Sequence, residues 1–251
     1  KENSSEYTIK ADKDATICLS ANGEIIGLGI ATGDNQIINI TPQQRNTEIV
    51  LTVTKQNYYR HTEIIKVIPS TGPYLIFDDC VLNDENNNNQ ADFNEMSELN
   101  IALHNVGTEA ISNVNVTLHS DSPYVEILNN NNTFGNINVN EIISLENTFK
   151  IKIKDNVIDQ TKIYFNMEMT SGDMHYTDRF YITAMAPVMF ASEKSMTDLN
   201  DNHINGINKG ESAKFTFKIK NEGHSNSDTI AVYYNIMAPF VKVEENPILI
   251  E

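Results

Sequence analysis

The residues best suited to chemistry lie in a polar run from Asp84 to Glu95, which reads DENNNNQADFNE. Carboxylate or amide side chains stand at alternate positions, and a glutamate closes the run eleven residues after its first aspartate. Oxygen ligands at alternate positions of a tight coil, a backbone carbonyl and a closing bidentate carboxylate make up a calcium loop. The run therefore predicts either a calcium site or an asparagine-rich turn that binds no ion.

In the calcium interpretation each residue of the run has a role. Glu95 closes the site, Gln90 offers its main-chain carbonyl, and Asp92 assists directly or through a water. The sharp turn falls on Asn89, a residue type that tolerates the left-handed conformation better than most. The side-chain ligands are Asp84, Asn86 and Asn88. Because the loop follows a linker, we expect an ordered loop to fix how the first and second domains meet.

A second run of the same kind lies 116 residues further on, from Asn200 to Glu211, and reads NDNHINGINKGE. The same shift aligns Glu95 with Glu211 and HNVG (104–107) with KNEG (220–223). A self-similarity that persists at one fixed shift indicates a tandem repeat. The sequence therefore predicts two copies of one loop-bearing domain.

The second run offers poorer ligands than the first. Its first position is an asparagine, its third can offer only a carbonyl, and Asp198 and Asp201 are possible substitutes for the missing carboxylate. We do not expect His203 to bind a transition metal, because no second His or Cys stands at ligand spacing. The predicted ligand positions are Asn200, Asn202, Ile204, Gly206, Asn208 and Glu211.

Short polar–apolar alternations predict that both loops lie among β-strands. Six strand-like bursts lie within residues 5–68, and PSTGP (69–73) resembles a stiff linker. Further strands follow, with Leu99, Ile101 and Leu103 expected on one buried face and Val114, Val116 and Leu118 on another. No stretch has a sustained helical period. We predict an all-β chain of tandem immunoglobulin-like sandwiches with domains 1–70, 71–186 and 187–251, the last cut partway through its repeat.

Charge and composition exclude several classes of function. The 251-residue chain has 18 basic and 34 acidic residues, for a net charge of −16, which disfavours binding to nucleic acid or to an anionic membrane. No apolar run approaches the roughly 18 residues of a transmembrane helix. Cys18 and Cys80 fall in different predicted domains, so we expect two free thiols. The opening KENSSEYTIK resembles a cut edge, as in a fragment or a mature product.

The loops resemble those of a known group of proteins. Loops of the form D-x-N-x-N-G-x-x-D-P-G-E, followed by a strand and N-x-G, occur in β-sandwich modules of secreted Bacteroidetes peptidases. The first domain is similar to the Ig-like domain that follows the catalytic domain of gingipain-type cysteine peptidases (clan CD, family C25), through residues 11–32 and 51–67. Phe93 and Lys209 replace the proline of that pattern and Asn94 its last glycine, which affects the expected ion affinity more than the fold.

The resemblance implies a non-catalytic region of a secreted or surface-associated protease. The catalytic domain would lie upstream, and Cys18 and Cys80 lack the neighbouring signatures of a clan CD nucleophile. We therefore expect this chain to be no enzyme, to be a calcium-stabilised spacer, and to have the upstream catalytic domain as its partner. The alternative is an adhesin fragment that binds glycan or a host protein, with Tyr58 and Tyr59 as contact residues or as ordinary edge-strand packing.

Overall fold

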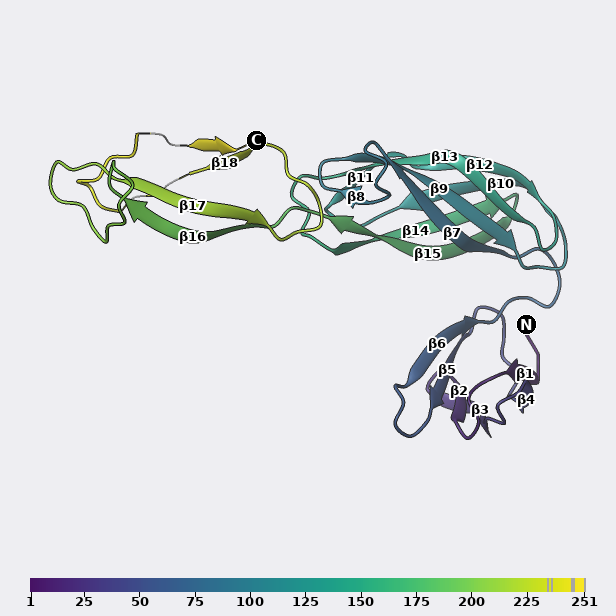
Figure 1. The fold of residues 1–251 in the computed structure, drawn as a ribbon. Helices are drawn as coiled ribbons and strands as arrows, with labels where there is room; N and C mark the ends of the chain where they lie inside the picture. The colour runs from purple at the N-terminus through teal and green to yellow at the C-terminus, as the bar shows by residue number, and fades with distance from the viewer. Residues whose placement is uncertain (234, 236, 245–246, 251) are drawn as a thin grey trace.

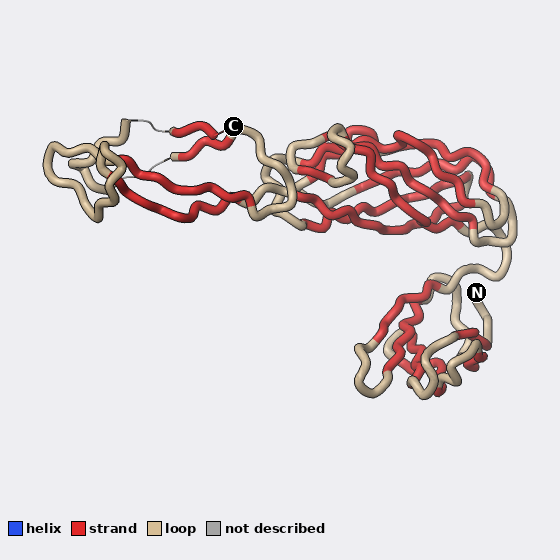
Figure 2. Tube along the Cα trace, viewed as in Figure 1, coloured by secondary structure: helices blue, strands red, loops and turns tan. Residues whose placement is uncertain are grey.

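A computed structural model describes residues 1–233, 235, 237–244 and 247–250. These residues form strands and turns without any helix (Figure 2), which confirms the predicted all-β class. The strands gather into three units, β1–β6, β7–β15 and β16–β19. The first unit lies beside one end of the second, and the third extends from the opposite end (Figure 1). Among the described residues there is no helix that could cross a membrane.

The first unit contains two small sheets that enclose one core. One sheet pairs β1 (Glu6–Ile9) with β4 (Gln36–Asn39), and the other has the order β3-β2-β5-β6. All six strands lie where the alternation of polar and apolar residues predicts them. The bounds in the second sheet are β2 (Thr16–Ala21), β3 (Glu24–Ile30), β5 (Glu48–Thr54) and β6 (His61–Lys66). Its inward side chains include Ile17, Leu19, Ile49 and Leu51, all buried.

The second unit is a sandwich of a four-stranded and a five-stranded sheet. The four-stranded sheet has the order β11-β13-β9-β7, and the five-stranded sheet has the order β12-β10-β14-β15-β8. The bounds are β7 (Leu75–Asp84), β8 (Ala91–Asp92), β9 (Met96–Asn105), β10 (Ile111–His119), β11 (Val125–Asn129), β12 (Asn131–Ile137), β13 (Ile142–Ile153), β14 (Thr161–Ser171) and β15 (Met174–Met185).

The core of the second unit lies between its two sheets. The six residues predicted to face inward from β9 and β10 are all fully buried: Leu99, Ile101, Leu103, Val114, Val116 and Leu118. Side chains at every second position of a strand share one face, so each sheet presents one apolar surface to the other. Across the interior, Phe180 stacks on Phe77 and Phe165, with ring centroids 4.8 and 5.2 Å apart.

Four strands of the second unit, β7, β8, β11 and β12, were not specifically predicted from the sequence. Strand β7 is the most important of these, since it leads into the first loop. Its alternation is interrupted at Asp78, where the pairing with β9 shifts register between Phe77 and Asp79. A bulge moves later side chains to the opposite phase, and the strict two-residue period is lost.

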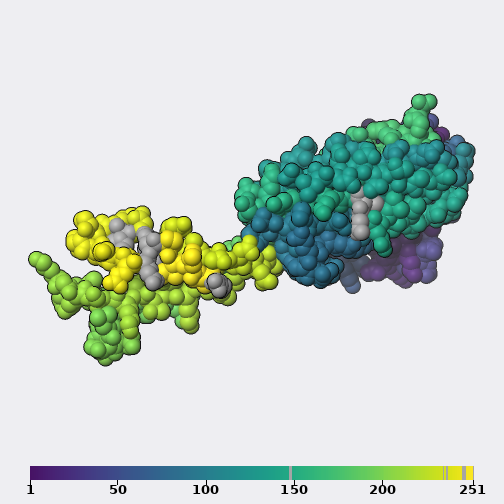
Figure 3. All heavy atoms as spheres, turned by 90° about the horizontal axis from the view of Figure 1, so that it is seen from above, coloured from purple at the N-terminus to yellow at the C-terminus, as the bar shows by residue number. Residues whose placement is uncertain are grey.

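The third unit contains two hairpin-like pairs, β16 (Met189–Thr197) with β17 (Lys214–Asn221) and β18 (Ile230–Val232) with β19 (Ile248–Ile250). It projects from the second unit as a narrow extension (Figure 3). Within its described residues no apolar side chain is buried, and Phe190 and Phe215 are each 56% exposed. Burial of apolar area therefore contributes little to the stability of this unit.

Candidate functional site

The first loop lies between two core strands and docks onto a third. Asp84 ends β7, Asp92 ends the two-residue strand β8, and Glu95 immediately precedes β9. Strand β8 pairs in parallel with the end of β15. The amide of Phe93 then donates to the carbonyl of Met185 (2.9 Å). The loop is thus attached to the last residues of the second unit.

Asparagine side chains shape the turn of the loop. The Oδ1 atom of Asn86 accepts from the amide of Asn88 (3.0 Å), and Oδ1 of Asn88 accepts from the amide of Gln90 (2.8 Å). Asn87 and Asn89 lie between these residues, each with φ of 59°. Asparagine adopts this left-handed conformation readily because its short side chain can bond locally.

The loop holds three carboxylates, and two of them are buried. Asp92 is 6% exposed and Glu95 is 8% exposed, and the amide of Asp92 donates to Oε2 of Glu95 (3.3 Å). The side-chain amides of Asn86 and Asn88 donate to Oδ2 of Asp92 at 3.1 and 2.7 Å. Oδ2 of Asp84 accepts from the amide of Gln90 (2.9 Å).

Two oxygens of this group have no hydrogen-bond partner. Oδ1 of Asp84 and Oδ1 of Asp92 are both buried and unsatisfied. Burial raises the pKa of the Glu95 carboxyl, and the negative charges of Asp84 and Asp92 raise it further. An unpaired buried carboxylate oxygen is costly, and a cation is the partner that would satisfy several of them together. The all-oxygen donor set fits a hard ion such as calcium.

Ion binding would require one local adjustment. In this structure Asn86 and Asn88 present amide nitrogens to Asp92, whereas a calcium ligand presents an oxygen. Half a turn of each side-chain amide exchanges the two atoms, at the loss of the Oδ1 hydrogen bonds from the main-chain amides of Asn88 and Gln90. Within the described part of the chain, no three His, Cys, Asp or Glu side chains form a metal-binding group by themselves. Amide and main-chain oxygens would therefore have to complete the site.

The raised pKa of Glu95 leads to a pH dependence in calcium-free buffer. A carboxyl with a raised folded-state pKa stabilises the fold below its unfolded pKa, and this stabilisation is lost as pH rises through the folded pKa. We therefore expect the free energy of unfolding of wild type, relative to Glu95→Gln, to increase as pH falls from neutrality through that interval. Urea titrations in EGTA across this pH range measure the difference. A difference that is independent of pH would contradict the prediction.

The second loop is open to solvent. Oδ1 of Asp198 accepts from the amides of Asn200 and Asn202 (2.8 and 2.9 Å), while Oε2 of Glu211 accepts from the amide of Asn208 (2.8 Å). These hydrogen bonds lower the pKa of both carboxyls, with the Asn202 side chain the largest influence on Asp198 and the Asn208 amide the largest on Glu211. The carboxylates at the two ends of the loop thus have separate partners. The other predicted positions, Ile204 and Gly206, lie between them, and Asp201 pairs with Lys214 (2.8 Å).

The strand register changes the alignment of the two loops. Asn83 pairs with Glu98 in the second unit, and Thr197 pairs with Lys214 in the third. The strands before the loops are thus related by a shift of 114, and the strands after them by a shift of 116. Asp198 rather than Asn200 is therefore the counterpart of Asp84, and the second loop is two residues longer.

The N-x-G motif anchors the linker that enters each loop-bearing unit. Oδ1 of Asn105 accepts from the amides of Tyr74 (3.2 Å) and Gly107 (3.1 Å). A β-carbon on Gly107 would lie 2.4 Å from both the Gly72 oxygen and the Tyr74 nitrogen. Only glycine permits this close approach, so the N-x-G motif binds the linker segment around Pro73.

The third unit repeats this anchor. Oδ1 of Asn221 accepts from the amides of Val188 and Gly223, both at 3.0 Å. A β-carbon on Gly223 would lie 2.2 Å from the Ala186 oxygen. The N-x-G pattern was recognised in the sequence, but its partner segment was not, because the two lie about thirty residues apart.

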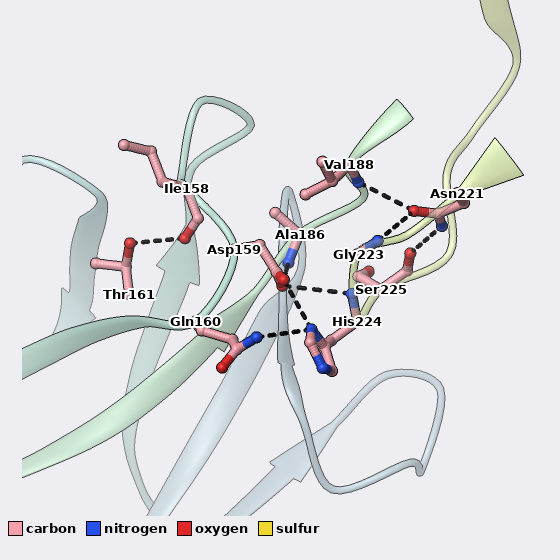
Figure 4. A network of polar contacts seen from close by, with 10 residues as sticks. All are labelled: Ile158, Asp159, Gln160, Thr161, Ala186, Val188, Asn221, Gly223, His224 and Ser225. Carbon is pink, nitrogen blue, oxygen red and sulfur yellow. Dashed lines mark hydrogen bonds and ion pairs between the residues drawn. The ribbon is translucent and has the colours of Figure 1, made fainter. Parts of the chain in front are cut away.

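An aspartate from the second unit reinforces this second junction (Figure 4). Oδ1 of Asp159 accepts from the amide of Ala186 (3.0 Å), and its Oδ2 lies 2.7 Å from Nδ1 of His224. The Gln160 side-chain nitrogen also lies 3.2 Å from that ring nitrogen. A carboxylate can only accept, so Nδ1 of His224 carries the proton and donates to Asp159.

These positions correct one expectation about the first loop. The ten-residue strand β7 separates the loop from the linker at 69–73, so the loop does not lie at the junction of the first and second units. Its contacts with Ala184 and Met185 place it next to the segment that enters the third unit. Any effect of the loop on unit orientation therefore concerns the second and third units.

The family comparison supports an assignment for the first unit. Residues 3–68 match the peptidase family C25, C-terminal Ig-like domain. The first unit is thus similar to the Ig-like domain of C25 peptidases. No curated protein matches the chain.

One of the solved structures that match is a beta-glycosidase from Bacteroides vulgatus, at 14% identity and a TM-score of 0.28. The match covers 73% of this chain but only 23% of that protein, so the chain spans about a quarter of its length. A superposition this loose has no bearing on function.

The cysteines do not have the surroundings of a peptidase nucleophile. Cys18 lies in β2 of the first unit and Cys80 in β7, and both thiols are free. Burial raises the pKa of the Cys80 thiol to about 12, and the charge of Asp79 adds to the effect. A nucleophilic cysteine needs the opposite shift, toward the thiolate. Cys80 thus lacks the thiolate character that a peptidase nucleophile requires.

Proposed function

We propose that this chain is a non-catalytic, calcium-stabilised spacer region of a gingipain-type C25 cysteine peptidase that is secreted or held at the outer cell surface. The match of residues 3–68 to the C25 Ig-like domain is the observation that carries the proposal. The partner is the catalytic domain of the same polypeptide. Three consecutive β units suit an extended support for the catalytic domain rather than an enclosure around it.

The proposed calcium ligands are the oxygens that converge in the first loop. Asp84 and Asp92 contribute their unsatisfied Oδ1 atoms, and Glu95 contributes a buried carboxylate. Asn86 and Asn88 contribute amide oxygens after their side chains turn, and Gln90 its main-chain carbonyl. Bound calcium neutralises the mutual repulsion of the three carboxylates. Because the loop is paired to the end of β15, the ion stiffens the exit toward the third unit.

An exposed aliphatic face on the C25 Ig-like domain suits the proposed catalytic partner. Ile25, Leu28 and Ile30 on β3 and Ile64 on β6 are 59–66% exposed. The strand pairing puts them on the outer face of one sheet, opposite the buried core. Strands β2 and β5 lie between β3 and β6, so these side chains occupy the two edges of one sheet face, which a partner could cover.

Charged substitutions on this aliphatic face test the proposal. In the intact polypeptide we expect Leu28→Glu with Ile64→Glu to accelerate thermal loss of hydrolysis of fluorogenic Arg and Lys substrates, because glutamate at a packed apolar contact loses its hydration. Ile37→Glu, 60% exposed on β4, is the matched control. The isolated chain should hydrolyse neither substrate and should melt at the same temperature with either change. Equal inactivation of both variants, or activity in the isolated chain, would overturn the proposal.

The alternative function, an adhesin fragment, has one feature in its favour. Tyr58 and Tyr59 lie in the turn between β5 and β6 and are 64% and 103% exposed. Lys55 lies over the Tyr58 ring, 5.1 Å from its centroid, so that ring has a local partner. Binding on a glycan array that is lost with Tyr58→Ala and Tyr59→Ala would favour adhesion through this turn.

A further inference from the structure

The outer face of the five-stranded sheet bears a cluster of two tyrosines and two cations, on the adjacent strands β14 and β15. Tyr164 pairs across the strands with Tyr181, and their ring centroids lie 5.5 Å apart. The guanidinium of Arg179 lies 4.2 Å from the Tyr164 centroid, and Nζ of Lys162 lies 4.3 Å from the Tyr181 centroid. We name these four residues the tyrosine–cation cluster.

The charge of the cluster contrasts with that of the chain. The protein carries 34 acidic and 18 basic residues, yet neither Lys162 nor Arg179 forms an ion pair within the described residues. Stacking on tyrosine rings holds both cations in place and leaves their N–H groups available. A positively charged spot held in fixed geometry is complementary to an anion.

The cluster borders two hollows in the surface. A hollow of about 280 Å³ lies between it and the β10–β11 connection, and its polar lining includes Asp121, Ser122 and Asn166. A second hollow of about 340 Å³ lies on the other side of Arg179 and Tyr181, which line it together with Asp79 and Cys80. Arg179 therefore stands between two recesses that a ligand could occupy at once.

We propose that the tyrosine–cation cluster is a binding site for an acidic carbohydrate, with a uronate carboxylate held by Arg179 and Lys162. The planar guanidinium can bind a carboxylate through two parallel hydrogen bonds. Tyrosine combines an apolar ring edge with a hydroxyl, which suits a sugar ring. This site is independent of calcium and of the spacer role, so its failure would leave both unaffected.

The rest of the sheet face favours a carbohydrate over an acidic peptide. Beyond the cluster the outward side chains include neutral amides and hydroxyls, with Asn131 bonded to Thr117 (3.0 Å) and Thr133 bonded to Asn115 (2.8 Å). Such groups donate and accept like sugar hydroxyls. A bound peptide is instead recognised by apolar pockets or by pairing with a strand edge.

Titration calorimetry of the whole chain with trigalacturonate tests the site. We expect binding to weaken at least about tenfold in Arg179→Gln and in Lys162→Gln, since each removes a charge-assisted contact. The matched control, Lys150→Gln, removes an exposed lysine from β13 in the other sheet of the sandwich and should bind like wild type. Circular dichroism melts establish that each variant is folded.

Three further ligands determine the ligand class. Cellotriose, which lacks the carboxylates, should bind at least about tenfold more weakly than trigalacturonate. A sulfated heparin trisaccharide that binds equally well and loses affinity in the same variants would support an acidic carbohydrate site that accepts either anion. Preferential binding of a hexaglutamate peptide would overturn the proposal, as would no binding of trigalacturonate or equal binding of trigalacturonate to wild type, Arg179→Gln and Lys162→Gln.

Discussion

Replacing Asn105 by alanine is expected to lower the free energy of unfolding of the second unit by about 3 kcal/mol or more. The side chain is fully buried and accepts from the amides of Tyr74 and Gly107. It also donates to the carbonyls of Glu109 (2.8 Å) and Ile137 (3.2 Å). Each buried group left without a partner costs roughly 1–3 kcal/mol, so the losses accumulate. Urea titration followed by circular dichroism measures the change.

The repeat supplies a matched control for this variant. Asn221 makes the same pair of acceptor bonds and donates to the carbonyl of Ser225 (2.7 Å), but it is exposed. Water can replace bonds lost at an exposed site, so we expect Asn221→Ala to cost less than about 1 kcal/mol. Equal costs at the two positions would show that burial is not the source of the effect.

Millimolar calcium is expected to raise the melting temperature of wild type by about 10 °C relative to EGTA. A ligand present at 100 times its dissociation constant stabilises the folded state by roughly 2.7 kcal/mol. For a domain of this size each 1 kcal/mol shifts the melting temperature by roughly 4 °C. Calorimetry in the two buffers checks this result, and an unchanged melting temperature would leave the loop as a polar turn without an ion.

Variants at the two closing glutamates locate the effect. Glu95→Gln should abolish most of the calcium-dependent shift, because it removes a buried carboxylate from the converging group. Glu211→Gln should preserve it, since that carboxylate is exposed and already accepts from Asn208. If Glu211→Gln removed the shift and Glu95→Gln did not, the ion would belong to the second loop.

Much of the fold follows from local pattern, and the exceptions have physical causes. The strands of the first unit and the inward faces of β9 and β10 were predictable, because their side chains alternate without interruption. Strand β7 was harder to predict, because its bulge near Asp78 breaks the alternation. Short strands such as β8 depend on partners far away in sequence, and local propensity does not encode those.

The candidate site was predictable in composition but not in environment. The spacing of Asp84 and Glu95 indicated which residues could meet. It could not indicate that two carboxylate oxygens would be buried without partners, nor that the loop would pair with β15. The shift of 116 also concealed the two-residue difference at Asp198, since strand pairing rather than residue identity reveals it.

The N-x-G anchor has a consequence for how such chains are assembled. The linker residue and the N-x-G motif that binds it belong to the same unit in both cases. The pairs are Tyr74 with Asn105 in the second unit and Val188 with Asn221 in the third. A gene segment that starts at Pro73 or Pro187 therefore encodes both the linker segment and the motif that binds it. Such a segment can be copied or moved behind an unrelated neighbour without compensating changes there. Contacts between neighbouring units, such as that of Asp159 with His224, then distinguish one junction from another.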